Sequence, residues 1–152
     1  MKLVLPAKLR ARIESEARAA FPRECCGLIE GVREADAARG LGLHPARNIA
    51  ARADRFEIDA EDHFAALKAA RAHGCVLIGC YHSHPNGQAV PSATDQHGAG
   101  EEDFLWLIAG LSGSEAPVTL AAFVYSAAGF LPAELASPTG ADLVTSSVKA
   151  RN

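Results

Sequence analysis

The segment CVLIGCYHSHP, residues 75–85, constrains the fold more than any other feature of the chain. It is an unbroken apolar run that turns polar at its C-terminal end, which is typical of a central strand that delivers functional groups to the edge of a sheet. Such a strand needs neighbouring strands and helices to cover its faces. We therefore predict an α/β protein with its chemistry at the end of this strand, at His82 and His84.

Apolar residues at helical spacing predict two helices. Residues 6–21 carry Leu9, Ile13, Ala17 and Ala20 on one face and stop at Pro22, and residues 60–74 repeat the pattern. A loop with a short helix is expected over residues 91–103. Further strands are expected at residues 24–31, 41–49, 104–109, 118–125 and 129–135. The interpretation is one domain over residues 1–137, followed by a flexible tail at 138–152.

Size and charge exclude several classes of protein. A chain of 152 residues with a net charge of -3 and scattered arginines fits one domain and argues against nucleic-acid binding. The charged N-terminal segment argues against a signal peptide, and the uncharged stretch 116–133 is broken by proline and glycine, so no membrane association and a cytoplasmic location are expected. The four cysteines fit no CxxC spacing and are interpreted as reduced core residues. The sequence specifies no oligomeric state.

His82 and His84 are two residues apart, so a strand turns both imidazoles to the same face. A catalytic zinc site needs three protein ligands and an open position for water. Asp95 is the best third ligand, because the turn Pro85-Asn86-Gly87 lets the chain double back. Two other interpretations compete. An HxH pair alone is weak support for a metal, and Ser92-x-x-Asp95 also fits a helix capping box that would occupy Asp95.

His82-Ser83-His84, seven residues, Ser92, two residues and Asp95 match the JAMM motif position by position. With the segment Pro22–Leu28, the chain resembles the JAMM (Mov34/MPN/PAD-1) metalloproteases from Glu24 to about Ala109. The resemblance implies the MPN (JAB/MPN, cytidine-deaminase-like) fold, a curved mixed sheet flanked by helices. It also implies a peptidase or isopeptidase with one Zn²⁺ per chain on His82, His84 and Asp95, a bound water, and Glu24 as general base.

Zinc chemistry gives each of these residues a role. Zinc lowers the pKa of its bound water toward about 7 and polarises the scissile carbonyl. Glu24 would take the proton from that water, and Ser92 would donate a hydrogen bond to the oxyanion. Other polar residues receive no catalytic role: Glu30 is expected on the surface, His97 on a solvent-facing turn, and three histidines are expected to be structural, namely His44, His63 and His73.

Other enzyme classes fit less well. The HExxH motif of other zinc metalloproteases is absent, and so is the CxxC that a zinc deaminase would need. The HxHxDH motif of metallo-β-lactamases would need an aspartate and a histidine where Pro85-Asn86-Gly87 stands. Cys25 and Cys26 lie in an apolar strand, which is a poor place for an exposed nucleophile. A structural zinc would need a fourth protein ligand.

The main alternative is a catalytically silent MPN-type scaffold or binding module for ubiquitin-like proteins. Silent relatives typically lose the ligands, and this chain keeps them. The short span from Asp95 to Trp106 leaves no room for the loops of polyubiquitin-specific relatives. The resemblance to compact bacterial members therefore implies a ubiquitin-like sulfur-carrier protein as the substrate. Such a carrier would be cleaved at its C-terminal Gly-Gly or freed of an attached amino acid.

Overall fold

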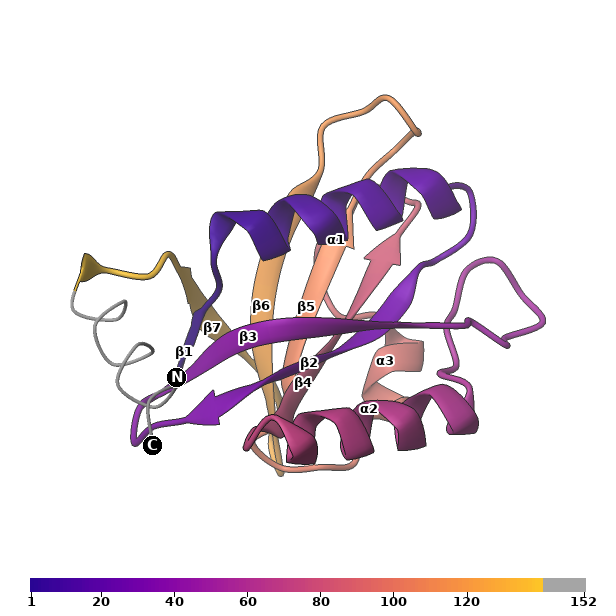
Figure 1. The fold of residues 1–152 in the computed structure, drawn as a ribbon. Helices are drawn as coiled ribbons and strands as arrows, with labels where there is room; N and C mark the ends of the chain where they lie inside the picture. Colours follow the sequence, from indigo (N-terminus) through magenta and orange to yellow (C-terminus); the bar gives the residue numbers. More distant parts are fainter. Residues whose placement is uncertain (141–152) are drawn as a thin grey trace.

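The computed structural model describes residues 1–140, which form an α/β domain as the sequence predicts (Figure 1). The described elements are β1 (Lys2–Val4), α1 (Ala7–Ala20), β2 (Cys26–Arg33), β3 (Ala37–Ala46), α2 (Ala60–Ala72), β4 (Val76–His84), α3 (Ala93–Gly98), β5 (Leu105–Gly110), β6 (Thr119–Ser126) and β7 (Gly129–Ala136). Every predicted helix and strand is confirmed to within a few residues. The predicted tail lies mostly outside the described residues, from position 141 onward.

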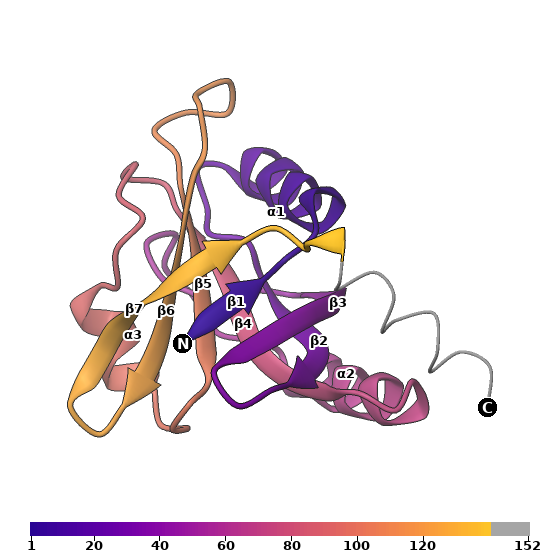
Figure 2. The ribbon, with the colours of Figure 1, turned by 90° about the vertical axis from the view of Figure 1, so that its left-hand side faces the viewer.

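The strands form one mixed sheet in the order β1-β3-β2-β4-β5-β6-β7, which closes into a barrel through β1. β1 pairs in parallel with both β3 and β7, and Figure 2 shows it between these two strands. β4 and β5 are also parallel, and the remaining neighbours are antiparallel. The expectation of a mixed sheet with helices is confirmed, but its closure was not predicted, because the three residues of β1 are too few to display a period.

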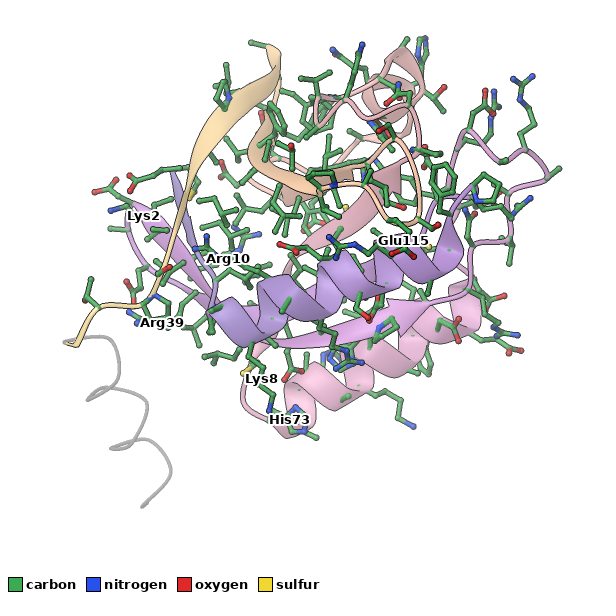
Figure 3. The ribbon with its side chains drawn as sticks, turned by 90° about the horizontal axis from the view of Figure 1, so that it is seen from above. Lys2, Lys8, Arg10, Arg39, His73 and Glu115 are labelled. Carbon is green, nitrogen blue, oxygen red and sulfur yellow. The ribbon has the colours of Figure 1, made fainter. Side chains whose placement is uncertain are left out.

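One face of the sheet packs on α1, which lies above it in Figure 1 and nearest the viewer in Figure 3. Ile13 and Ala17 of the helix are fully buried against strand residues that include Tyr81. The Tyr81 hydroxyl donates to Glu16 Oε2 at 2.6 Å. Gly27 pairs with Tyr81 across β2 and β4, and an added Cβ would come within 2.4 Å of the tyrosine side chain, so any larger residue here would displace Tyr81.

The opposite face packs on α2, with α3 beside it (Figure 1). Leu28, Cys80 and Trp106 form a second apolar cluster with Ala66 of α2. Because side chains alternate along a strand, the residue pair that follows Cys80 on this face of β4 is His82 and His84. The site thus lies on the outer face, away from the α1 core.

Two further expectations concern the cysteines and membrane association. None of the four cysteines, all within the described residues, forms a disulfide; Cys26 and Cys80 are buried, whereas Cys25 and Cys75 are half-buried. Between residues 1 and 140, no helix has the length and apolar character needed to cross a lipid bilayer.

Candidate metal centre

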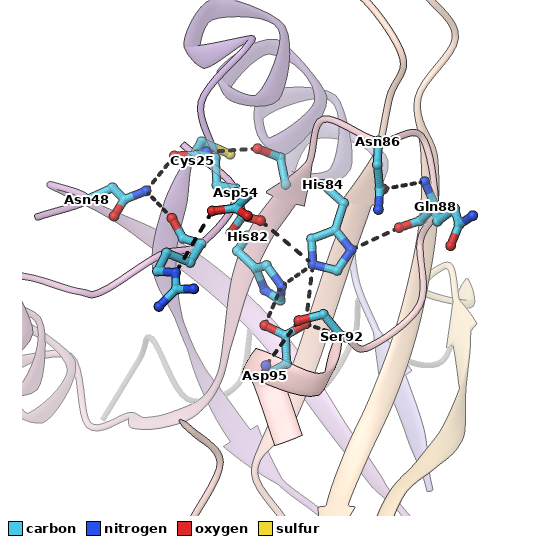
Figure 4. Close-up of polar contacts among 12 residues, drawn as sticks. Cys25, Asn48, Asp54, His82, His84, Asn86, Gln88, Ser92 and Asp95 are labelled. Carbon is cyan, nitrogen blue, oxygen red and sulfur yellow. Dashed lines mark hydrogen bonds and ion pairs between the residues drawn. The ribbon is translucent and has the colours of Figure 1, made fainter. Parts of the chain in front are cut away.

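The end of β4 brings two imidazoles together as the HxH spacing predicts. His82 Nε2 and His84 Nε2 lie 3.0 Å apart, with the rings at an interplanar angle of 67° (Figure 4). Both side chains are almost completely buried, with relative exposures of 0% for His82 and 4% for His84. β4 is held between β2 and β5, so both imidazoles project from the middle of the sheet.

Asp95 reaches the two imidazoles from α3. Its Oδ1 lies 3.2 Å from His82 Nε2, and its Oδ2 lies 3.2 Å from His84 Nε2. The chain returns to the strand end through the predicted turn, in which Gly87 adopts a φ of 84° and donates its N–H to the His84 carbonyl. This backbone region favours glycine. The structure therefore places all three predicted ligands in mutual contact.

The capping box is also present, and Asp95 forms it while contacting both imidazoles. Ser92 Oγ accepts the Asp95 N–H at 3.1 Å, and Asp95 Oδ2 accepts the Ser92 N–H at 2.6 Å. A carboxylate has two oxygens with several acceptor positions. The cap uses Oδ2, which also contacts His84, and Oδ1 faces His82.

Glu24 lies immediately before β2 and faces the same cluster. Its Oε1 is 4.0 Å from His84 Nε2, and one ligand atom from each of Glu24, His82 and His84 lies within 4.8 Å of the others. The carboxylate is 5% exposed, and its Oε2 has no hydrogen-bond partner within residues 1–140. Burial raises the pKa of Glu24 to about 7, although the charge of His84 opposes the rise. A carboxylate with that pKa exchanges protons readily near neutral pH.

The remaining charges suit a cation. Burial alone would raise the pKa of Asp95, but hydrogen bonds from His82 and His84 outweigh it and hold that pKa well below its usual range. Burial lowers the pKa of His82, which keeps its imidazole neutral. Burial also disfavours charged His84, yet the hydrogen bond and charge of Asp95 raise the pKa of His84 above 6.5. The centre thus offers one anionic ligand and two imidazoles in contact with it.

A zinc ion fits these residues by distance as well as by ligand type. Ligand atoms at about 2.0–2.2 Å from one tetrahedral zinc lie about 3.3–3.6 Å from each other. His82 Nε2 and His84 Nε2 are 3.0 Å apart, within a few tenths of an ångström of that spacing, and Asp95 presents a different oxygen to each imidazole, both at 3.2 Å. Two imidazole nitrogens facing each other can share only one proton, whereas both can bind a cation. Three protein ligands would leave one position for water.

The two histidines are held differently on their other sides. His84 Nδ1 lies 2.9 Å from the Gln88 carbonyl, the usual second hydrogen bond of a metal-binding histidine. His82 Nδ1 is buried without a partner within residues 1–140. Instead, the Phe56 ring stacks on His82 at 4.3 Å and 24°, and Trp106 meets it edge-on at 5.7 Å. Phe56 could not be assigned to the site from the sequence, because a stacking contact over 26 positions leaves no local pattern.

A cavity of about 440 Å³ borders the centre beside Asp95. Its walls are mainly apolar and include Phe56, Phe104 and Trp106, while Glu57 and Glu101 are among its polar residues. It offers room for an extended chain segment next to the predicted ligands.

Three other predictions have clear outcomes. Glu30 was expected on the surface but is 7% exposed, and its carboxylate contacts His44 Nε2 at 2.8 Å and His73 Nδ1 at 3.0 Å. Glu30 follows Leu28 by two positions on the face of β2 that packs on α2, and His73 lies at the C-terminal end of that helix (Figure 3). His97 is exposed, as predicted. Burial raises the pKa of Cys25 to about 11 and of Cys26 to about 12, which disfavours a cysteine nucleophile.

Comparisons with known proteins agree with this geometry. A model of the family described as prokaryotic homologs of the JAB domain matches residues 6–124. A protein from Haloferax volcanii named desampylase is 37% identical over 112 residues, which cover 70% of this chain and 79% of that protein. A protein from Thermus thermophilus named probable TtuB-protein conjugate cleaving protease is 39% identical over 75 residues, 49% of this chain and 47% of that protein.

Solved structures give the same result for the fold. A protein from Desulfitobacterium hafniense superposes with a TM-score of 0.81 at 29% identity, over 90% of this chain and 92% of that one. A protein from Salinibacter ruber superposes with a TM-score of 0.70 at 32% identity, over 92% of this chain and 93% of that one. The likeness therefore extends over nearly the whole described structure.

Proposed function

Because the chain belongs to the family of prokaryotic homologs of the JAB domain, we propose that it is a zinc-dependent peptidase or isopeptidase. The proposed reaction is hydrolysis of an amide bond at or near the C-terminal Gly-Gly of a ubiquitin-like carrier protein. The observation that carries the proposal is the convergence of His82, His84 and Asp95 with the buried carboxylate of Glu24 directly beside them.

His82, His84 and Asp95 would hold the metal. Zinc bound there supplies a Lewis acid for the scissile carbonyl and a water of lowered pKa. With zinc in place, Glu24 would take the proton from the water beside it and then deliver it to the leaving amine, so one carboxylate would act first as base and then as acid. Its raised pKa, about 7, suits a group that must both accept and release a proton near neutrality.

Ser92 stabilises the oxyanion in this proposal. Its Oγ accepts the Asp95 N–H, and within residues 1–140 the hydroxyl proton has no acceptor of its own. That proton is therefore available to an oxygen that becomes negative beside the metal. A single donor of this kind is worth about 10²- to 10³-fold in rate.

The substrate class rests on the relatives and on the open site. One relative is named desampylase, and another is named for cleaving TtuB-protein conjugates. The cavity of about 440 Å³ beside Asp95 is much smaller than a folded domain, so we assign it to the C-terminal tail of the carrier. The span from Asp95 to Trp106 holds the rest of α3 and a short loop, without an inserted element.

The test compares the wild type with Glu24→Gln, which keeps the shape of the side chain and removes its basicity. Each protein is assayed for bound zinc and for cleavage of carrier conjugates that end in Gly-Gly. The wild type should hold about one zinc and cleave, whereas Glu24→Gln should hold zinc and lose about 10²- to 10⁴-fold in kcat. A wild type that binds zinc and the carrier but cleaves no conjugate would favour the silent binding module.

A further inference from the structure

Asn48 follows β3 and makes four hydrogen bonds with its side chain. Its Nδ2 donates to the Glu24 carbonyl and to the Arg55 carbonyl, both at 3.0 Å. Its Oδ1 accepts the N–H of Ala50 at 3.0 Å and that of Glu57 at 3.1 Å. A primary amide has two N–H donors and one oxygen with two acceptor positions. Every position is used, so no other side chain of this length could replace asparagine here.

Two of these bonds hold the residues on either side of Phe56. The Asn48 side chain donates to the carbonyl of Arg55, just before Phe56, and accepts the N–H of Glu57, just after it. The backbone that carries the Phe56 ring is therefore held on both sides. The ring stacks on His82, whose Nδ1 has no hydrogen-bond partner within the described residues. Partners of a metal-binding histidine commonly contribute 10- to 100-fold to metal affinity or activity. Stacking by Phe56 takes the place of that partner.

A third bond joins the same amide to Glu24. It reaches the main-chain carbonyl of Glu24, directly beside the buried carboxylate (Figure 4). The neighbouring side chain of Arg23 donates to the Ala50 carbonyl at 2.7 Å, which ties the 49–57 loop to the same segment. Residues 51–55 at the tip of that loop are exposed, and its base is closed by the Ile49 N–H, which donates to the Glu57 carbonyl at 2.9 Å.

We propose that Asn48 is a positioning residue that sets Glu24 and, through the 49–57 loop, the ring of Phe56 against His82. The proposal rests on the proposed function, in which Glu24 is the base and His82 a zinc ligand. It extends that function, because one side chain would hold both Glu24 and the ring that stacks on His82. A misplacement of about 1 Å at a reacting group can lower the rate about 10²-fold.

The test is Asn48→Asp, which keeps both acceptor positions and removes both donors. Ala53→Asp is the control, because it adds the same charge to the same loop at an exposed side chain that makes no hydrogen bond. Three quantities are measured: kcat and KM with a Gly-Gly carrier conjugate, the zinc Kd by chelator competition, and the emission of Trp106. The chain has one tryptophan, and it contacts Phe56 edge-on at 5.7 Å.

Asn48→Asp should lower kcat by about 10- to 100-fold with KM within about 2-fold of the wild type, and weaken zinc binding by about 10-fold. Trp106 emission of the zinc-free protein should shift to longer wavelength as Phe56 leaves it, and Ala53→Asp should match the wild type throughout. A raised KM at unchanged kcat, or a lowered kcat with unaltered Trp106 emission and zinc affinity, would overturn the proposal.

Phe56→Leu keeps an apolar contact with His82 but removes the stacked ring. It is the second test variant, used if Asn48→Asp does not fold. It should weaken zinc binding by about 10-fold, and wild-type zinc affinity in this variant would overturn the coupling to His82. The Trp106 emission and the zinc affinity can both be measured without a substrate. If the wild type cleaves no conjugate, the proposed function fails while these two measurements still decide the role of Asn48.

Discussion

Replacing Asp95 with asparagine separates the two tasks of this side chain. The amide oxygen can still accept the Ser92 N–H, so the capping box is kept, but the anionic ligand between His82 and His84 is lost. Four-ligand zinc sites in peptides are worth about 10–16 kcal/mol, so one ligand contributes about 2.5–4 kcal/mol. At about 1.4 kcal/mol per tenfold change, the zinc Kd should weaken by about two orders of magnitude or more.

Thermal unfolding gives the assay. At a zinc concentration of about 100 times the wild-type Kd, binding stabilises the wild type by about 2.7 kcal/mol. A chain of this size gains about 2–4 °C in Tm per kcal/mol, so zinc should raise the wild-type Tm by about 5–11 °C. A variant with a Kd weakened about 100-fold gains only about 0.4 kcal/mol at the same concentration, or about 1 °C.

The control is Ser92→Ala, which removes the capping hydroxyl and leaves the carboxylate of Asp95. Loss of an N-cap costs about 1 kcal/mol, which should lower the Tm with and without zinc and leave the zinc-induced shift as in the wild type. A wild-type zinc shift in Asp95→Asn would mean that Asp95 caps α3 and binds no metal, and the ligand assignment would be wrong.

Three further results are expected. In activity assays, Ser92→Ala should lower kcat by about 10²- to 10³-fold at unchanged zinc content, because the oxyanion loses its donor. In urea titrations, Gly27→Ala should lower the free energy of unfolding by about 1–3 kcal/mol, because its Cβ meets the Tyr81 ring, whereas Gly100→Ala, with open space around it, should not. Zinc affinity measured against pH should fall on acidification, beginning above pH 6.5, because zinc needs neutral His84 and Asp95 raises the pKa of His84.

Several parts of the site could be read from the sequence because they are local. Period-two spacing puts His82 and His84 on one face of a strand, and the Pro85-Asn86-Gly87 turn predicts the return of the chain to Asp95. The prediction of Glu24 as the general base rested on a different kind of evidence. Nothing in its local pattern distinguishes it from a solvated carboxylate, and the family resemblance alone identified it, while the structure shows that β2 places it 4.0 Å from His84.

Other features appear only when distant segments meet. Closure of the sheet pairs Lys2 with Glu134, and a three-residue strand carries no pattern that would predict this partner. Glu30 resembles a surface residue in the sequence, but in the fold its carboxylate is buried against His44 and His73.

The sequence by itself determined the helices, most of the strands and the metal-binding motif, because each depends on the spacing of residues close together in the chain. The tertiary structure decided which carboxylate oxygen of Asp95 caps α3 and which faces His82. It also decided that Asn48 joins Glu24 to the loop that carries Phe56. Both depend on hydrogen-bond directions and contacts across tens of residues, which side-chain periodicity does not record.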